Sequence, residues 1–77
     1  MSMAWEVTLE DIETVLEAHG MGDKAQMIYD DFDGQDRVEK AILYYTDMDD
    51  QTAAANSEIE DILMEDGVLS GEKKFNE

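Results

Sequence analysis

The sequence predicts an all-α protein, a small bundle of three to four short helices. Apolar residues recur at steps of three and four along most of the chain, which is the spacing of an amphipathic helix. Proline is absent, so no position forbids a helix. No segment alternates apolar and polar residues over the length of a strand. The charge is high enough to suggest disorder, but 43% of the residues are hydrophobic and their helical spacing favours a folded core.

The chain of 77 residues is long enough for one domain with a modest core. We assign residues 1–69 to this domain and residues 70–77 to a flexible polar tail. Cysteine is absent, which excludes disulfides and thiolate metal ligands. No apolar run approaches the length of a membrane span, and the N-terminus lacks the pattern of a signal peptide, so we expect a cytoplasmic protein.

The first predicted helix lies between Thr8 and Gly20. Thr8 is a suitable N-cap, and Asp11 stands at the capping-box position. Gly20 is expected to end the helix in the left-handed conformation. The apolar stripe of this helix consists of Leu9, Ile12, Val15 and Leu16.

Two further helices are predicted in the middle of the chain. One begins at Asp23, with Gln26 as its capping partner, and ends before Gly34. The other runs from about Gln35 to Thr46. The residues expected on the buried side of the former are Ala25, Ile28, Tyr29 and Phe32, and those of the latter are Val38, Ala41, Ile42 and Tyr45.

The last predicted helix has two possible starts. It begins either near Asp49 or at Ser57, where Glu60 would complete a capping box. We favour the longer helix because an apolar stripe continues across the supposed break. That stripe consists of Met48, Thr52, Ala55, Ile59, Ile62 and Leu63. Gly67 is expected to end the helix.

The chain has more aromatic residues than so small a core readily buries. Trp5, Tyr29, Tyr44 and Tyr45 are the ones in question. We expect some of them to cap the bundle or to be buried in a homodimer interface.

The sequence offers little for catalysis, and we expect neither enzymatic activity nor a cofactor. His19 is the only histidine, and its predicted place at a helix C-terminus favours a structural cation over a general base. There is no Gly-rich phosphate loop, nucleophile elbow or plausible triad. No serine is preceded by Asp and followed by Leu, as the prosthetic-group site of an acyl carrier protein requires.

Two acidic segments have part of the spacing of a calcium-binding loop. In the first, Asp31 and Asp33 fit, but Tyr29 and Lys40 occupy the two end positions, where the strongest ligands belong. The second, at residues 47–58, lacks the turn glycine and lies within predicted helix. We therefore expect weak divalent-ion binding by clustered carboxylates and no specific metal site.

Charge is the strongest indication of function. The chain has 21 acidic and 5 basic residues, a formal net charge of −16. Such a surface repels nucleic acid and anionic membranes and attracts basic protein surfaces at long range. Direct binding of nucleic acid or membrane is therefore excluded as a first choice.

Acidic residues form two rows at one-turn intervals on the predicted helices. The first acidic row is Glu10, Glu13 and Glu17, and the second acidic row is Glu58, Asp61 and Glu65; Asp30, Asp31 and Asp33 add charge near a helix junction. The helical rise separates successive charges in a row by ~4.5 to 6 Å, which is comparable to the spacing of phosphates along one nucleic-acid strand. We predict that these nine carboxylates contact a basic protein groove.

In size, charge, helicity and lack of catalytic residues, the chain resembles the small acidic counter-defence proteins of phages and mobile elements. That group includes DNA mimics, anti-restriction proteins and anti-CRISPR proteins. The resemblance implies inhibition by stoichiometric binding to a host nucleic-acid-binding or defence protein in the host cytoplasm. Such an inhibitor would compete with DNA or RNA or block the assembly of its target. No functional residue is carried over from the resemblance.

Three alternatives stay open. The chain could be an adaptor, chaperone-like or antitoxin-like module whose main contact is apolar and uses Trp5, Tyr44 and Tyr45. It could instead bind calcium or another divalent ion. Finally, the acidic rows could be solvated faces that only keep the protein dispersed, although a charge of −16 also opposes folding by self-repulsion.

Overall fold

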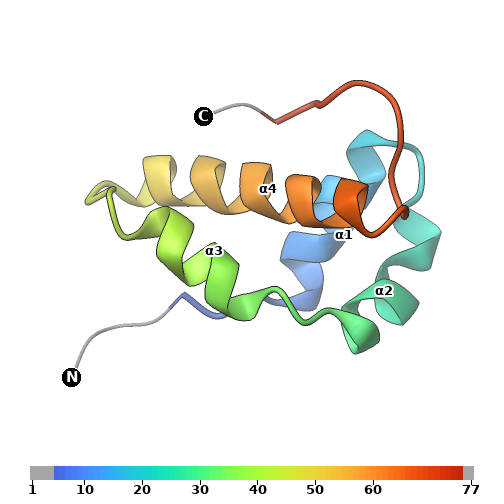
Figure 1. The fold of residues 1–77 in the computed structure, drawn as a ribbon, viewed down its shortest axis with the longest axis horizontal. Coiled ribbons are helices and arrows are strands. Elements are labelled where there is room, and N and C mark those ends of the chain that lie inside the picture. Colours follow the sequence, from blue (N-terminus) through green and yellow to red (C-terminus); the bar gives the residue numbers. More distant parts are fainter. Residues whose placement is uncertain (1–4, 76–77) are drawn as a thin grey trace.

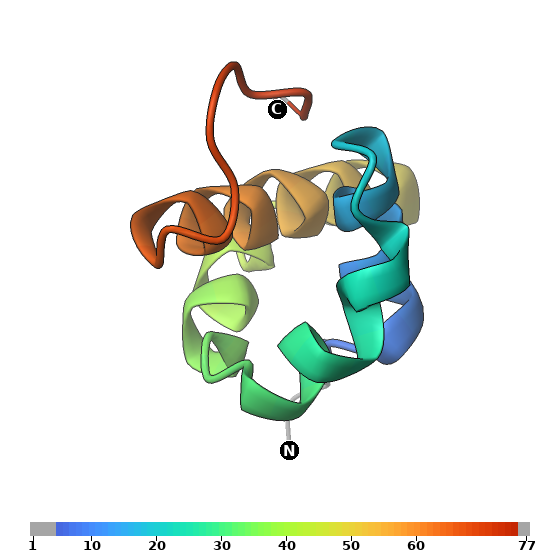
Figure 2. The ribbon, with the colours of Figure 1, turned by 90° about the vertical axis from the view of Figure 1, so that its right-hand side faces the viewer.

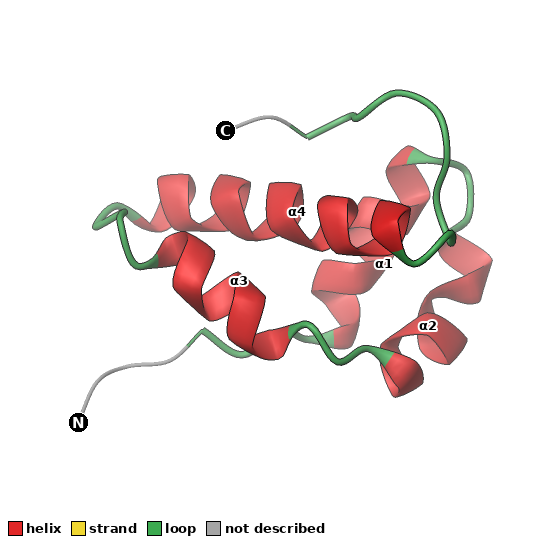
Figure 3. Ribbon diagram, viewed as in Figure 1, coloured by secondary structure: helices red, strands yellow, loops and turns green. Residues whose placement is uncertain are grey.

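The protein is an all-α bundle, as the sequence predicts. The computed structural model describes residues 5–75, and this part of the chain contains helices and turns but no strand (Figures 1 and 3). Residues 1–4 and 76–77, which we assigned to the domain and to the tail, lie outside the described residues. The elements in chain order are α1 (Leu9–Ala18), the 3-10 turn η1 (Gly22–Lys24), α2 (Ala25–Asp31), α3 (Gln35–Ile42) and α4 (Met48–Glu65).

The longest helix, α4, forms one side of the bundle and organises the core. Both α1 and α3 pack against α4, and α2 packs against α1. Figure 2 shows α3 on one side beneath α4, with α1 and α2 on the other side. The most deeply buried apolar side chains come from α1, α3 and α4, and they are Ile12, Val15, Leu16, Val38, Ala54, Ala55, Ile59 and Leu63.

The predicted start of α1 is confirmed in detail. The Thr8 hydroxyl accepts a hydrogen bond from the Asp11 backbone N–H at 3.2 Å, and the Asp11 carboxylate accepts one from the Thr8 N–H at 3.0 Å. This reciprocal pair satisfies two donors that the first turn of a helix leaves unpaired.

Both α1 and α4 end where the sequence predicts, at a glycine with a positive φ. Gly20 has φ 73° and Gly67 has φ 82°, a conformation that costs energy for residues with a Cβ. At the end of α1 the Met21 N–H donates to the Leu16 carbonyl at 2.8 Å. The equivalent bond exists after α4, so both ends are Schellman motifs.

The longer version of the last helix is confirmed. α4 begins at Met48, and the Asp47 carboxylate caps it by accepting from the backbone N–H groups of Asp49 and Asp50. The predicted stripe is buried from Ala55 onward. The expectation was wrong for Met48 and Thr52, which lie near the start of α4 and are exposed.

The predicted bounds of the two middle helices were partly wrong. Asp23 lies inside η1 and caps nothing, because the Lys24 N–H bonds to the Met21 carbonyl and closes a 3-10 turn there. α3 ends at Ile42 rather than near Thr46, since the chain must reverse direction before α4.

The aromatic residues divide between core and surface. Trp5, Phe32 and Tyr45 are partly buried against the core, whereas Tyr44 is 88% exposed. Tyr29 was expected on the buried side of α2, but 36% of its surface is exposed. The reason is that α2 is short: it has seven residues, and only Ala25 is buried in the core.

After α4 the chain turns back along this helix (Figure 1). Leu69 is buried, and Phe75 packs against the core. The Lys73 ammonium donates to the Ser57 hydroxyl at 2.8 Å, and Ser57 is buried in the middle of α4. The flexibility of residues 70–77 stays a prediction, but the described part of this segment contacts α4.

Candidate partner-binding surface

All three carboxylates of the second acidic row are paired with cations of the protein itself. Arg37 on α3 donates from Nε to Glu58 at 3.0 Å, and from Nη1 and Nη2 to the two oxygens of Glu65 at 2.7 and 3.1 Å. The Lys73 Nζ lies 2.9 Å from an Asp61 carboxylate oxygen. The side-chain hydrogen bonds from Arg37, followed by its charge, lower the pKa of Glu65 below its ordinary value.

This pairing reduces the charge that the second acidic row presents to a partner. Arg37 contacts both oxygens of Glu65 but only Oε2 of Glu58, and Lys73 contacts only Oδ1 of Asp61. A basic partner would have to displace Arg37 to reach Glu65, and it would meet a cation already in place beside Glu58 and Asp61.

The first acidic row has no such partners. Glu10, Glu13 and Glu17 are exposed on α1, and none of their carboxylates makes a hydrogen bond or ion pair within residues 5–75. Residues three and four apart lie on one face of a helix, so the three carboxylates point to the same side. Gly22 lies close to one end of this row, because a Cβ there would lie 2.6 Å from the Glu17 Cγ. The row is therefore an open acidic face.

The three acids near the predicted helix junction are also at the surface. Asp30 and Asp31 are exposed at the end of α2, and Asp33 follows in the link to α3. The Asp30 carboxylate accepts a hydrogen bond from the Gln26 amide at 2.9 Å. Because α2 packs against α1, these acids belong to the same half of the bundle as the first acidic row. The second acidic row lies on α4, where α3 packs.

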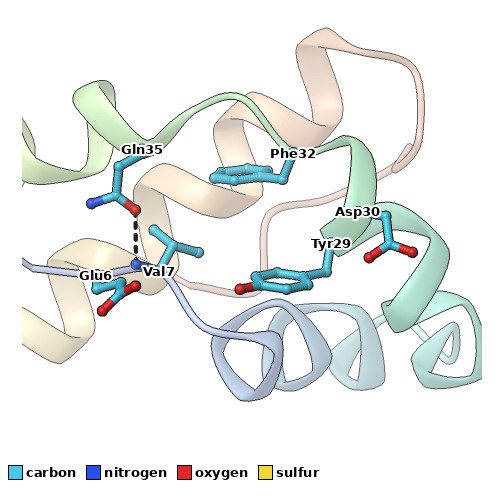
Figure 4. Close-up of a pocket in the computed structure, with 6 residues that line it drawn as sticks. All are labelled: Glu6, Val7, Tyr29, Asp30, Phe32 and Gln35. Carbon is cyan, nitrogen blue, oxygen red and sulfur yellow. Dashed lines mark hydrogen bonds between the residues drawn. The ribbon is translucent and has the colours of Figure 1, made fainter.

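An open pocket of about 370 Å³ lies beside the end of α2 (Figure 4). One wall is fixed by Gln35, whose Oε1 accepts from the Val7 N–H at 2.9 Å and whose amide N–H group donates to the Trp5 carbonyl and to Glu39. The residues that line this pocket are Glu6, Val7, Tyr29, Asp30, Phe32 and Gln35. Sequence reasoning missed Glu6, because it precedes the first helix and belongs to no periodic pattern.

A further acidic residue, Glu60, is completely buried. Its carboxylate accepts three hydrogen bonds, from His19 Nε2 at 2.6 Å and from the backbone N–H groups of Lys74 and Phe75 at 2.7 and 3.0 Å. Burial by itself raises the pKa of Glu60. The hydrogen bonds from Lys74, His19 and Phe75 outweigh that effect, and the pKa lies below its ordinary value. Glu60 therefore connects the end of α1, α4 and the C-terminal segment.

His19 has the structural role that its position suggests, with a more specific partner than expected. It is the C-cap residue of α1, and its side chain is only 7% exposed. The sequence predicts attraction to the helix dipole, whereas the structure pairs the ring with Glu60 on another helix. Glu60 itself entered the sequence analysis only as a capping residue for the shorter α4.

Three large apolar side chains are exposed together at the turn between α3 and α4. Leu43 is 72% exposed, Tyr44 88% and Met48 68%, and we call this group the apolar corner. The apolar contact that the sequence suggested combined Trp5, Tyr44 and Tyr45. Of these only Tyr44 is exposed, since Trp5 and Tyr45 pack against the core. The indole Nε1 of Trp5 is buried and has no hydrogen-bond acceptor among the described residues.

Within residues 5–75, no group of three or more His, Asp or Glu side chains is placed to hold a metal ion. None of the described helices is long and apolar enough to cross a membrane. Comparison with protein-family models, curated proteins and solved structures finds no match to this chain.

Proposed function

We propose that this protein is a non-catalytic inhibitor that binds a basic surface of a nucleic-acid-handling or host defence protein. Its main contact is the first acidic row. One observation carries the proposal: Glu10, Glu13 and Glu17 are exposed and have no partner within residues 5–75, whereas every carboxylate of the second acidic row is paired.

The difference between the two rows matters for binding energy. Unpaired carboxylates attract a partner's Lys and Arg side chains without first losing an internal ion pair. The helical rise spaces the charges of the first acidic row by ~4.5 to 6 Å, so a groove that binds phosphates can accept them. Because α1 is capped at both ends and attached to the core, the row is presented on a rigid support.

The proposed activity is competition with DNA or RNA, or blockage of the target's assembly. As a counter-defence protein of a phage or mobile element, the chain would act in the host cytoplasm. Association through unpaired surface charges is fast and weakens as salt rises, because counterions screen such charges.

Affinity capture from a bacterial lysate tests this proposal with two matched variants. The first-row variant carries Glu10→Gln, Glu13→Gln and Glu17→Gln, and the control carries Glu58→Gln, Asp61→Asn and Glu65→Gln. Both remove three formal charges. We expect the first-row variant to lose a partner that the wild type captures at low salt, and the control to retain it. Equal capture by both variants, with helical content unchanged, would refute the proposal.

The apolar corner supports a second candidate function, that of an adaptor or antitoxin-like module. Leu43, Tyr44 and Met48 are large apolar residues exposed within six positions of the chain, and Tyr is a frequent anchor of protein interfaces. Binding through this corner would persist at high salt and be lost on Tyr44→Ala. The two candidates therefore differ in both the salt dependence and the sensitive residue.

A further inference from the structure

We propose that the pocket beside α2 receives an arginine side chain from a protein partner. The assignment rests on the proposed function for the nature of the ligand, a basic protein, and it adds a specific receptor site. The pocket volume of about 370 Å³ falls within the usual range for small-ligand sites. Its lining combines two aromatic rings with two carboxylates and contains no basic side chain.

The aromatic rings provide surfaces on which a guanidinium group can stack. Tyr29 and Phe32 both extend from the end of α2 toward the N-terminal segment (Figure 4). Tyr29 is 36% exposed and Phe32 is partly buried, so a ligand can reach them. Gly34 permits the position of the Phe32 ring, since a Cβ there would lie 2.8 Å from the Phe32 Cζ. A planar guanidinium stacks on such rings, whereas a lysine ammonium offers only a point charge.

The polar groups of the pocket are acceptors in need of donors. Glu6 makes no hydrogen bond or ion pair within the described part of the chain. Asp30 uses one carboxylate oxygen, Oδ1, to accept from Gln26. The Gln35 amide already makes hydrogen bonds to the N-terminal segment and to Glu39. It therefore stabilises one side of the pocket and is not expected to bind the ligand. Figure 4 shows Glu6 and Asp30 at opposite ends of the pocket, with the Tyr29 ring between them, so a guanidinium stacked on the rings would donate to Glu6, while Asp30 adds negative charge that repels an anion.

A short peptide tests the site without a known partner. Acetyl-Gly-Arg-Gly-amide is titrated into ¹⁵N-labelled protein, with the citrulline peptide as a neutral control of nearly the same shape. We expect saturable chemical-shift changes centred on Tyr29 and Phe32, with a dissociation constant about fivefold or more below that of the citrulline peptide. The lysine peptide should bind more weakly than the arginine peptide. Equal binding of the arginine and citrulline peptides, or shifts that follow all exposed carboxylates equally, would overturn the assignment.

Variants then place the ligand within the pocket. Tyr29→Leu and the double variant Glu6→Gln with Asp30→Asn should each abolish the saturable shifts. The double variant Asp49→Asn with Asp66→Asn removes the same formal charge from exposed residues outside the pocket and both acidic rows, and it should leave the titration unchanged. Loss of binding in this control would mean that net charge, not the pocket, attracts the peptide.

The same variants separate this inference from the proposed function. If partner capture depends on the first acidic row but the arginine peptide does not bind, the arginine site is contradicted and the proposed function is not. Peptide binding at the pocket without capture through the first acidic row would support the pocket and contradict the proposed function.

Discussion

Replacement of Glu60 by Gln is a direct test of how the bundle is held together. The substitution keeps the shape of the side chain but changes one carboxylate oxygen into an N–H₂ group. In the wild type, Oε2 accepts from His19 and the Lys74 N–H, and Oε1 accepts from the Phe75 N–H. In either orientation of the new amide, its N–H₂ group faces at least one of these buried N–H groups. Both groups are donors, so the hydrogen bond at that position is lost.

The expected loss of stability follows from those contacts. A hydrogen bond to a charged acceptor contributes about 1.5 to 3 kcal/mol, and a buried donor left without a partner costs a similar amount. We expect Glu60→Gln to lower the free energy of unfolding by about 2 to 3 kcal/mol, a large part of the ~4 to 12 kcal/mol available to a domain of this size. Urea denaturation followed by circular dichroism measures the change. The control is Glu13→Gln, which removes the same charge from an exposed side chain that has no partner in the described part of the chain.

A loss for Glu60→Gln within about 0.5 kcal/mol of the control would refute the reasoning. The pH dependence adds a second check. Because the fold lowers the pKa of Glu60, its stabilisation is fully present above the ordinary value of 4.5 and is lost as the pH falls through the folded pKa below it. The stability difference between wild type and Glu60→Gln should therefore narrow in acid. A difference that widens in acid would contradict the assigned hydrogen bonds.

Three further substitutions test other parts of the fold, each by urea denaturation. Gly20→Ala should cost about 1 to 2 kcal/mol, because the new Cβ meets no neighbour and only the positive φ is unfavourable; no loss would contradict the left-handed cap. Asp47→Ala should cost about 1 kcal/mol by removing the cap of α4, whereas Asp49→Ala should cost less, and equal losses would contradict the cap. Tyr44→Ala should change stability by less than about 0.5 kcal/mol, because the side chain is 88% exposed; a larger loss would mean that it is packed.

The features predicted well from the sequence are those decided within four residues. The capping box at Thr8 and Asp11 and the glycine stop at Gly20 depend on local hydrogen bonds and backbone conformation. The start of α2 was missed, although it also has a local cause. Asp23 has the composition of a cap, but the 3-10 turn closed by the Met21 carbonyl removes it from the cap position.

Which acidic residues are paired or buried depends on contacts between residues far apart in the sequence. The exposure of the first acidic row follows from the periodicity of α1 alone. The pairing of the second acidic row does not, because Arg37 lies 21 and 28 residues before Glu58 and Glu65 and reaches them only through the packing of α3 on α4. Likewise, Glu60 follows Glu58 and precedes Asp61, and only its contacts with His19 and the C-terminal segment distinguish it as buried.

The most direct test of the central claim is the affinity of a captured partner for wild type and the two row variants, measured by calorimetry at low and high salt. The account predicts that binding weakens steeply with salt, that neutralising Glu10, Glu13 and Glu17 abolishes it, and that neutralising the second acidic row has little effect. Affinity that is independent of salt, or lost equally with either row, would contradict it.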